Sequence, residues 1–226
     1  MNDPRLDALL RHSGIWRGDR PEMPAQPGIA TGHPALDALL PGGGWPRGAL
    51  AELIVEQEGI GELSLLLPAL AELSRAERWI TLVAPPHIPY APALAAGGVD
   101  LARLLIVRTA HSADTQWAME EALRSAACSA VLAWPGSINE RFQRRLQLAA
   151  EAGGGTGFWF TPAGQASSAS FAALRLRLSP APTGLAVRFV KRRGGGEVPP
   201  LVLDLPHALA RPAFPRPGLA GLRAAA

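Results

Sequence analysis

The sequence predicts an α/β protein with a mostly parallel, twisted sheet, helices on both faces of that sheet and a C-terminal β-hairpin. From residue 49 onward, short apolar runs alternate with longer amphipathic stretches, which is the pattern of β-α-β units. After residue 166 the pattern changes to two stretches in which apolar and polar residues alternate, which is typical of a half-buried hairpin. Hydrophobic residues make up 48% of the 226 residues, so one sizeable core is expected.

The individual elements follow from the spacing of the apolar residues. In the longer stretches these residues recur at helical spacing, whereas the shorter stretches are continuous apolar runs bounded by glycine, proline or polar turns. The expected helices cover residues 3–12, 63–76, 114–127 and 138–153, with a shorter one inside 30–44; the expected strands cover 49–55, 79–84, 129–134 and 156–161, with another inside 99–108; the hairpin lies within 170–180 and 184–193, followed by a short segment at 198–206.

Changes in composition divide the chain into three parts. Residues 1–28 contain the first helix and a Pro/Gly-rich linker, residues 29–205 contain the globular domain, and residues 206–226 form a flexible tail rich in Pro, Arg and Ala. The first residues carry acids and lack the apolar stretch of a secretory signal, and no apolar run is long enough to cross a membrane. Cys128 is the single cysteine, so an internal disulfide is excluded and the cytoplasm is the expected compartment.

The charged residues exclude several chemistries. Of the 22 basic residues only Lys191 is a lysine, so any reaction that needs a lysine must use it or be absent. The five histidines show no metal-ligand spacing and a single cysteine excludes thiolate zinc sites, so no metal is expected. The net charge of +3 is modest. No Ser-His-Asp arrangement stands out, and the sequence therefore does not indicate a hydrolase.

A glycine-containing loop lies between the strand 49–55 and the helix 63–76, which is where a phosphate-binding loop is expected. In the best alignment with the G-x-x-x-x-G-K-[ST] motif, the chain has carboxylates at the first glycine and at the lysine, and an apolar residue at the hydroxyl position. Each pair of like charges between these carboxylates and a triphosphate would cost about 4 kcal/mol at 4 Å in an effective dielectric of about 20. We therefore expect a degenerate loop that binds no nucleotide cofactor, formed by Glu56, Gly59, Gly61, Glu62 and Leu63.

The segment before this loop resembles the one that leads into the nucleotide site of RecA-family recombinases. This resemblance spans about residues 29–205 and implies a RecA-like P-loop NTPase core. It also implies that Tyr90 stands where recombinases have an adenine-stacking tyrosine. The residues that match as they stand are Thr31, Gly32, Leu36, Asp37, Gly42, Gly43, Gly44, Pro46, Gly48 and Glu52.

The same resemblance fails at the catalytic positions. Trp134 stands where the Walker B strand should end in aspartate, and residues 85–87 offer no glutamate to activate water. Thr161 and Pro162 are a weak substitute for the phosphate-sensing residue. The scaffold glycines are kept while the ATP chemistry is lost, so the resemblance implies a protein that is not an enzyme.

This combination, with the Trp-Arg-Gly sequence at 16–18 in a Pro-rich linker, resembles ImuA, the SulA/RecA-like accessory protein of the bacterial damage-inducible mutagenesis cassette. The resemblance implies a nucleoid-associated role in translesion synthesis after DNA damage. The implied partners are ImuB, RecA and, indirectly, an error-prone C-family DNA polymerase. Two alternatives stay open: a SulA-type inhibitor that binds the tubulin-like division protein, and a cryptic ATPase.

Five residues are candidates for binding protein partners. Lys191 and Arg193 occupy the positions from which recombinases contact the ATP of a neighbouring subunit, so docking on RecA is a hypothesis. In recombinases a linker segment adds to the edge of the next subunit's sheet, and Ile15 and Trp16 lie in the corresponding linker of this chain. Phe214 lies in a tail that resembles a segment folding on a partner such as ImuB. A solvated hairpin tip, packing of the linker on its own domain and simple disorder are the respective alternatives.

Four arginines are candidates for binding DNA. Arg141, Arg144 and Arg145 share one face of the expected helix 138–153, because their spacing is helical. Together with Arg192 they form a possible basic surface for DNA phosphates. A solvated helix face explains the same pattern equally well, and self-association is left open.

Overall fold

The computed structural model describes residues 27–167, 169–192 and 198–205. The predicted helix 3–12, the linker residues Ile15 and Trp16, Arg193 and the tail with Phe214 lie outside the described residues. The proposed division into a linker, a domain and a tail therefore stays a prediction at both ends.

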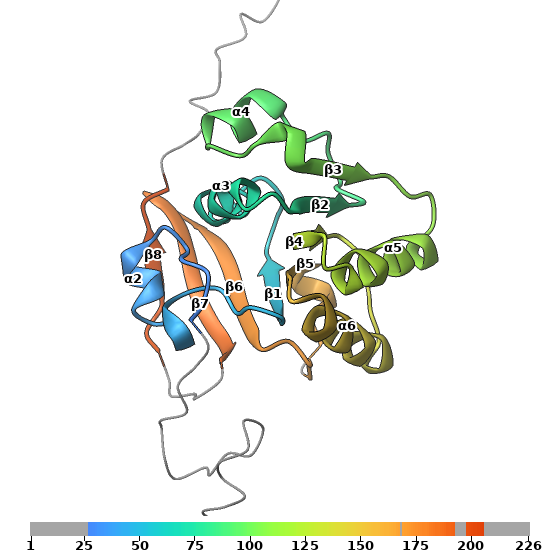
Figure 1. The fold of residues 1–226 in the computed structure, drawn as a ribbon. Coiled ribbons are helices and arrows are strands. Elements are labelled where there is room, and N and C mark those ends of the chain that lie inside the picture. The colour runs from blue at the N-terminus through green and yellow to red at the C-terminus, as the bar shows by residue number, and fades with distance from the viewer. Residues whose placement is uncertain (1–26, 168, 193–197, 206–226) are drawn as a thin grey trace, which may run out of the picture.

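The described strands form one sheet with the order β3-β2-β4-β5-β1-β6-β7-β8 (Figure 1). Strands β1 to β6 pair in parallel, whereas β7 is antiparallel to β6 and β8 is antiparallel to β7. The sheet is therefore mixed. Its strands are β1 (Leu50–Val55), β2 (Trp79–Val83), β3 (Leu104–Val107), β4 (Cys128–Ala133), β5 (Thr156–Pro162), β6 (Leu174–Ala181), β7 (Gly184–Arg192) and β8 (Leu201–Leu203).

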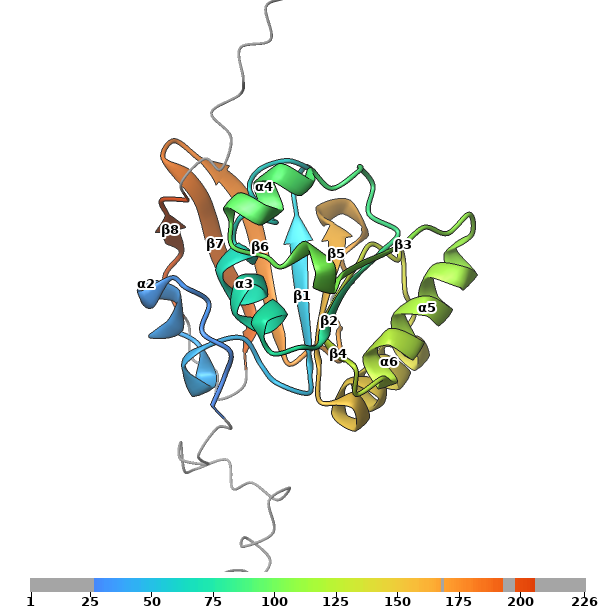
Figure 2. The same cartoon turned by 45° about the horizontal axis from the view of Figure 1, so that its top comes forward.

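Helices cover the two faces of the sheet unequally (Figures 1 and 2). Helices α2, α3 and α4 lie on one face, where they share a core with residues of β1, β2, β4, β5, β6, β7 and β8. Helices α5 and α6 lie on the other face and pack on β1, β2, β4 and β5. The helices are α2 (Pro34–Asp37), α3 (Leu67–Arg75), α4 (Ala91–Ala96), α5 (Ser112–Arg124) and α6 (Glu140–Gly153), with short 3-10 turns at Pro41–Gly43, Leu101–Arg103 and Ala163–Gln165.

The segment before β1 is held against the sheet by Trp45. The Trp45 backbone pairs with Ile29 in an antiparallel bridge, and its buried ring meets Phe158 of β5 edge-on, with the ring centroids 5.3 Å apart. The Thr31 amide donates to the Asp37 carboxylate at 2.9 Å, which closes the turn that precedes α2. Burial lowers the pKa of His33 in this turn, although Leu65 and Asp37 oppose the shift. The segment is therefore part of the core and not a separate arm.

The prediction of a RecA-like P-loop NTPase core is wrong. A phosphate loop opens directly into a helix, so that free backbone amides at the helix N-terminus point at the ligand. Here β1 is followed by irregular turns, and α3 begins only at Leu67, with Pro68 in its first turn. The loop amides also have a ligand of their own from Glu62, as the site geometry below shows. The described chain is an α/β fold with a mixed sheet.

Candidate functional site

The carboxyl ends of β1, β4 and β5 border a cleft of about 210 Å³. Ligands of open α/β sheets commonly bind at this edge, so it is the first place to examine. The cleft brings together residues that are far apart in the sequence, and three of its side chains are carboxylates. Its lining consists of Val55, Glu56, Gln57, Glu58, Glu62, Trp134, Phe160 and Pro162.

The Glu62 side chain occupies the glycine loop. Its Oε1 accepts a hydrogen bond from the Gly59 amide at 2.9 Å and its Oε2 accepts one from the Gly61 amide at 3.1 Å. Both glycines have positive φ angles, 78° and 103°, which turn these amides toward the carboxylate. The loop therefore already holds an anion, and this anion is part of the chain.

Aromatic and apolar side chains fill the rest of this edge. Trp134 stacks on Phe160, with the ring centroids 4.5 Å apart and the planes 6° from parallel. Leu63 packs against the core and does not face the cleft as a hydroxyl would. The Thr161 hydroxyl accepts a hydrogen bond from the buried Trp159 indole at 2.9 Å, so it is engaged inside the fold.

Two residues that border the loops at this edge are exposed. His87 Nε2 lies 2.7 Å from the Glu58 carboxylate, which ties the loop after β2 to the loop after β1. Tyr90, at the start of α4, has an exposed ring. Within residues 27–167, 169–192 and 198–205, no cluster of three His, Cys, Asp or Glu side chains is arranged to hold a metal ion. In the same part of the chain, no helix has the length and apolar character of a membrane span.

The three α6 arginines point outward but do not all remain available to a ligand. Arg145 forms an ion pair with the buried Glu120 of α5, and Arg124 contacts the same carboxylate at 2.6 Å. The guanidinium of Arg144 lies 5.8 Å from the ring centre of Phe171. Arg141 is exposed. Arg145 thus links α6 to α5 although it is itself exposed, whereas Arg141 and Arg144 have no ion pair among the described residues.

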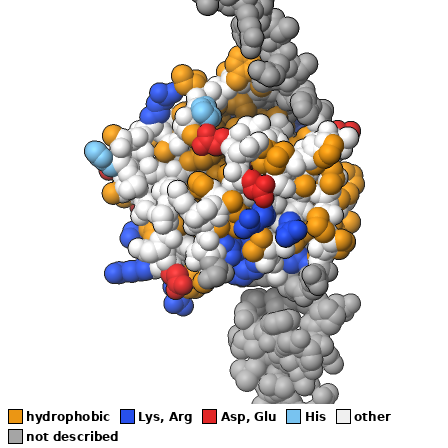
Figure 3. Space-filling view, turned by 180° about the vertical axis from the view of Figure 1, so that it is seen from behind, with side chains coloured by type: hydrophobic (Ala, Val, Ile, Leu, Met, Phe, Trp, Pro, Cys, Tyr) orange, Lys and Arg blue, Asp and Glu red, His pale blue; other side chains and the backbone are white. Residues whose placement is uncertain are grey.

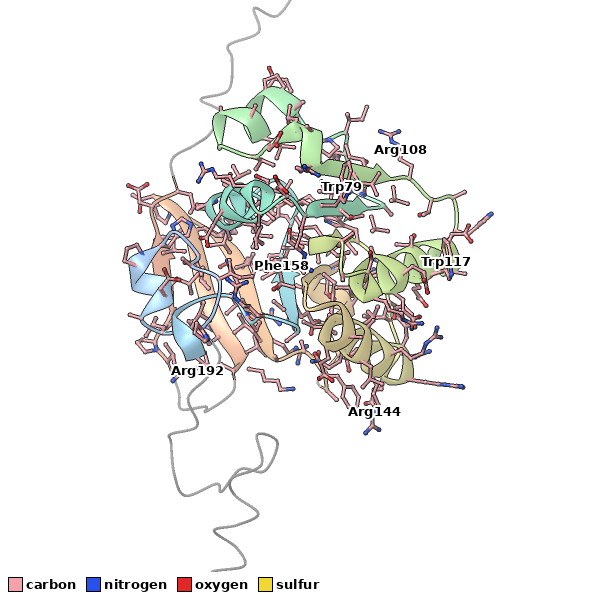
Figure 4. All side chains as sticks on the ribbon, viewed as in Figure 1. Trp79, Arg108, Trp117, Arg144, Phe158 and Arg192 are labelled. Carbon is pink, nitrogen blue, oxygen red and sulfur yellow. The ribbon has the colours of Figure 1, made fainter. Side chains whose placement is uncertain are left out.

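The two basic residues at the end of β7, Lys191 and Arg192, are bound back to the protein. Lys191 Nζ donates to the Ser170 carbonyl at 2.7 Å, and Arg192 donates to the Leu39 carbonyl at 2.7 Å. Figure 4 places Arg192 beside the β7 end of the molecule and Arg144 on the opposite side, near α6. The structure does not bring these arginines into one patch. DNA binding through them, and docking through Lys191 and the undescribed Arg193, stay predictions.

The chain is similar to two groups of bacterial proteins. The family model described as "Cell division inhibitor SulA" matches residues 48–157. SulA of Serratia proteamaculans is 30% identical over 119 residues, which cover 53% of this chain and 71% of that protein. Protein ImuA of Caulobacter vibrioides is 30% identical over 174 residues, which cover 70% of each chain. A crystal structure of SulA from Pseudomonas aeruginosa covers 50% of this chain and 97% of its own, with 27% identity and a TM-score of 0.43.

The chain belongs to the SulA/ImuA family.

Membership in this family agrees with the finding that the chain does not have a RecA-like P-loop NTPase core. The segment that the SulA family model matches runs from just before β1 into β5 and includes the whole glycine loop. The loop is therefore a SulA-family loop, and the resemblance of the segment before it to the recombinase entry segment misled the prediction. The resemblance to ImuA, in contrast, is confirmed.

Sequence reasoning missed the basic residues of the hairpin that face away from α2. Arg175 forms a buried ion pair with Glu52, and Arg177 and Arg188 lie directly opposite each other on β6 and β7. The signal was present, because Arg175 and Arg177 alternate with leucines in β6 at the period of a strand. The alternation predicts the hairpin, and it also places these arginines together on its polar face.

We expect the full-length protein to bind Mg-ATP more weakly than about 1 mM, which corresponds to less than about 4 kcal/mol of binding free energy. Glu62 already occupies the loop amides, and Glu56 and Glu58 add repulsion. Isothermal titration calorimetry measures this directly. Glu62→Gln is the matched control: it removes one charge at constant size, so any residual affinity should rise. A micromolar affinity of the unaltered protein would revive the cryptic ATPase.

Proposed function

We propose that this protein is a non-catalytic accessory factor of SOS-induced translesion DNA synthesis. It would act through contacts with ImuB and RecA, and through them would support an error-prone C-family polymerase. The observation that carries the proposal is the extent of the match to ImuA, which runs over 174 residues and so extends beyond the segment that the SulA model covers.

The cleft supports a role without nucleotide chemistry. Glu62 binds the amides of the glycine loop, Trp134 and Phe160 fill the end of β4 and β5, and Glu56 and Glu58 make the cleft acidic. A protein with such a cleft has no evident means of cleaving ATP. This supports a role that the protein carries out by binding other macromolecules.

Deletion of the gene tests the proposal in the source bacterium. We expect the frequency of mutations induced by ultraviolet light to fall toward that of unirradiated cells, because translesion synthesis would lose one of its factors. A plasmid copy should restore the frequency, and the Glu62→Gln variant should restore it equally well, because the role does not depend on nucleotide binding. An unchanged mutation frequency in the deletion strain would contradict the proposal.

Inhibition of cell division is the second candidate, favoured by the SulA family model over residues 48–157. Overproduction in undamaged cells separates the two functions. A division inhibitor produces long filaments within a few generations, whereas an accessory factor of mutagenesis leaves cell length unchanged. Purified ImuB, RecA and the tubulin-like division protein, each immobilised separately, then identify the direct partner.

A further inference from the structure

The face of the hairpin that points away from α2 and α3 is not covered by any described helix. In β6 and β7, one set of alternate side chains enters the core that α2, α3 and α4 cover, and it includes Leu176, Leu178 and Val187. The core under α5 and α6 contains residues of β1, β2, β4 and β5, and none of its described members comes from β6, β7 or β8. Beyond the buried Arg175, the second face of these three strands therefore has half-buried and exposed side chains and no helix over it.

An open groove of about 540 Å³ lies on this face. Arg177 of β6 and Arg188 of β7 line it and are directly opposite each other in the antiparallel register. We call it the arginine groove. Seen from behind, the molecule shows Lys and Arg side chains gathered together, with hydrophobic and acidic side chains beside them (Figure 3). The groove itself combines the two arginines with apolar side chains and with Glu56.

Two arginines in this arrangement repel each other. Like charges directly opposite on neighbouring strands destabilise a sheet. Among the described residues neither Arg177 nor Arg188 has an ion pair or a side-chain hydrogen bond, in contrast to Arg175, Lys191 and Arg192. An anionic group placed between the two guanidinium groups would remove this repulsion and form charge-assisted hydrogen bonds with both.

The surroundings of the pair select the kind of anion. Val190 and Pro200 line the groove, and Val202 of β8 is exposed on the same face, opposite Ala186. Glu56 also lines the groove and repels any anion, but the repulsion grows with the number of charges, so it is larger for the closely spaced phosphates of a nucleic acid than for one or two carboxylates. A protein segment can place one or two carboxylates between the two arginines, and it can pack apolar side chains on the valines. It therefore fits both the arginine pair and the apolar lining of the groove.

A second copy of this chain fits less well. A second copy would offer the carboxylates of its acidic cleft. Of these, Glu62 is bound to the amides of Gly59 and Gly61, and Glu58 is paired with His87. Glu52 and Glu120 are buried in ion pairs. Two of the three cleft carboxylates are therefore engaged, and so are the two buried ones.

We propose that the arginine groove is an interaction surface for an extended, acidic segment of a partner protein, in which carboxylate side chains alternate with apolar ones. The carboxylates bind Arg177 and Arg188, and the apolar side chains pack on Val190 and Val202. This surface adjoins the acidic cleft at Glu56, which lines both, and the inference holds whichever of the two functions above is correct.

Fluorescence anisotropy of the full-length protein with a labelled peptide, in which Glu alternates with Leu and Val, tests this proposal. We expect saturable binding that weakens at least about tenfold in the Arg177→Met/Arg188→Met double variant. The matched control is Arg141→Met/Arg144→Met, which removes the same charge from α6 and should stay within about twofold of the unaltered protein. Arg188→Met alone, at an exposed position, provides a second variant if the double variant does not fold.

The comparison probes decide what the groove binds. The same peptide with Gln in place of Glu should bind weakly, and Arg177→Glu/Arg188→Glu should prefer a peptide with Lys in place of Glu. Equal losses in the hairpin and α6 double variants, or equal binding of the Glu and Gln peptides, would overturn the proposal. Tighter binding of a labelled single-stranded oligonucleotide that depends on Arg177 and Arg188 would assign the groove to nucleic acid instead. A dimer in sedimentation that the Arg177→Met/Arg188→Met variant abolishes would assign it to self-association.

Discussion

Substituting Arg175 by Met will lower the free energy of unfolding by about 3–5 kcal/mol, because it leaves the Glu52 carboxylate buried without a partner. Arg175 Nε lies 2.6 Å from Glu52 Oε2, and each side chain is only 4% exposed. The two residues are register partners on β1 and β6, where the sheet continues toward the hairpin. Arg175 also donates to the Ser167 carbonyl at 2.6 Å, so its loss frees a backbone acceptor as well.

Urea denaturation followed by circular dichroism measures this loss. Two variants serve as controls. Arg188→Met removes an exposed arginine from the next strand and should change stability by less than about 0.5 kcal/mol. Glu52→Leu/Arg175→Met removes both charges, and it should recover most of the loss because no buried charge is left. A cost below about 1 kcal/mol for Arg175→Met alone would show that water reaches Glu52 and that the pair is not a buried one.

Substituting Trp45 by Ala will cost about 3–5 kcal/mol, because it removes a large and fully buried ring from the centre of the core. The ring contacts Phe158 of β5, and the Trp45 backbone pairs with Ile29. The substitution therefore loosens the segment before β1 from the sheet as well as leaving a cavity. Limited proteolysis should cut this segment faster in the variant than in the unaltered protein.

The same denaturation experiment with two further variants separates the causes. Trp117→Ala is the matched control, since Trp117 is exposed on α5 and its loss should cost less than about 0.5 kcal/mol. Trp45→Phe keeps an aromatic ring and removes the indole N–H, which has no hydrogen-bond partner among the described residues. Its cost should be well below that of Trp45→Ala. If the Phe and Ala variants are equally unstable, an aromatic ring alone does not hold this segment, and the full indole is required.

Much of the architecture was predictable because apolar periodicity is a local property. The expected strand 129–134 is β4, the expected helix 138–153 is α6, and the expected hairpin is formed by β6 and β7. The boundaries shifted most at α3, which was expected from residue 63 and begins at Leu67. Residues 62–66 are apolar enough for a helix, but they form turns. The Glu62 carboxylate in this segment accepts hydrogen bonds from the backbone amides of the glycine loop.

The assignment to a P-loop NTPase core failed because scaffold residues and site residues carry different information. The glycines and apolar residues before β1 determine how the backbone turns and packs. Because different α/β folds share such turns, these residues do not identify the P-loop NTPase core. What a loop binds depends on where its amides point and what already occupies them. The direction of the Glu62 carboxylate toward Gly59 and Gly61 settles that question, and it is a property of the folded loop.

By itself, the sequence determined the α/β class, the order of most elements, the carboxylates of the glycine loop and the resemblance to ImuA. The tertiary structure alone decided which charged groups are engaged and which are available. Arg145, Lys191 and Arg192 are bound to groups within the fold, whereas Arg177 and Arg188 face each other in an open groove. The physical reason is that the order of charged residues along the chain does not specify which groups each side chain meets across the sheet. Nor does it specify how far solvent reaches that side chain.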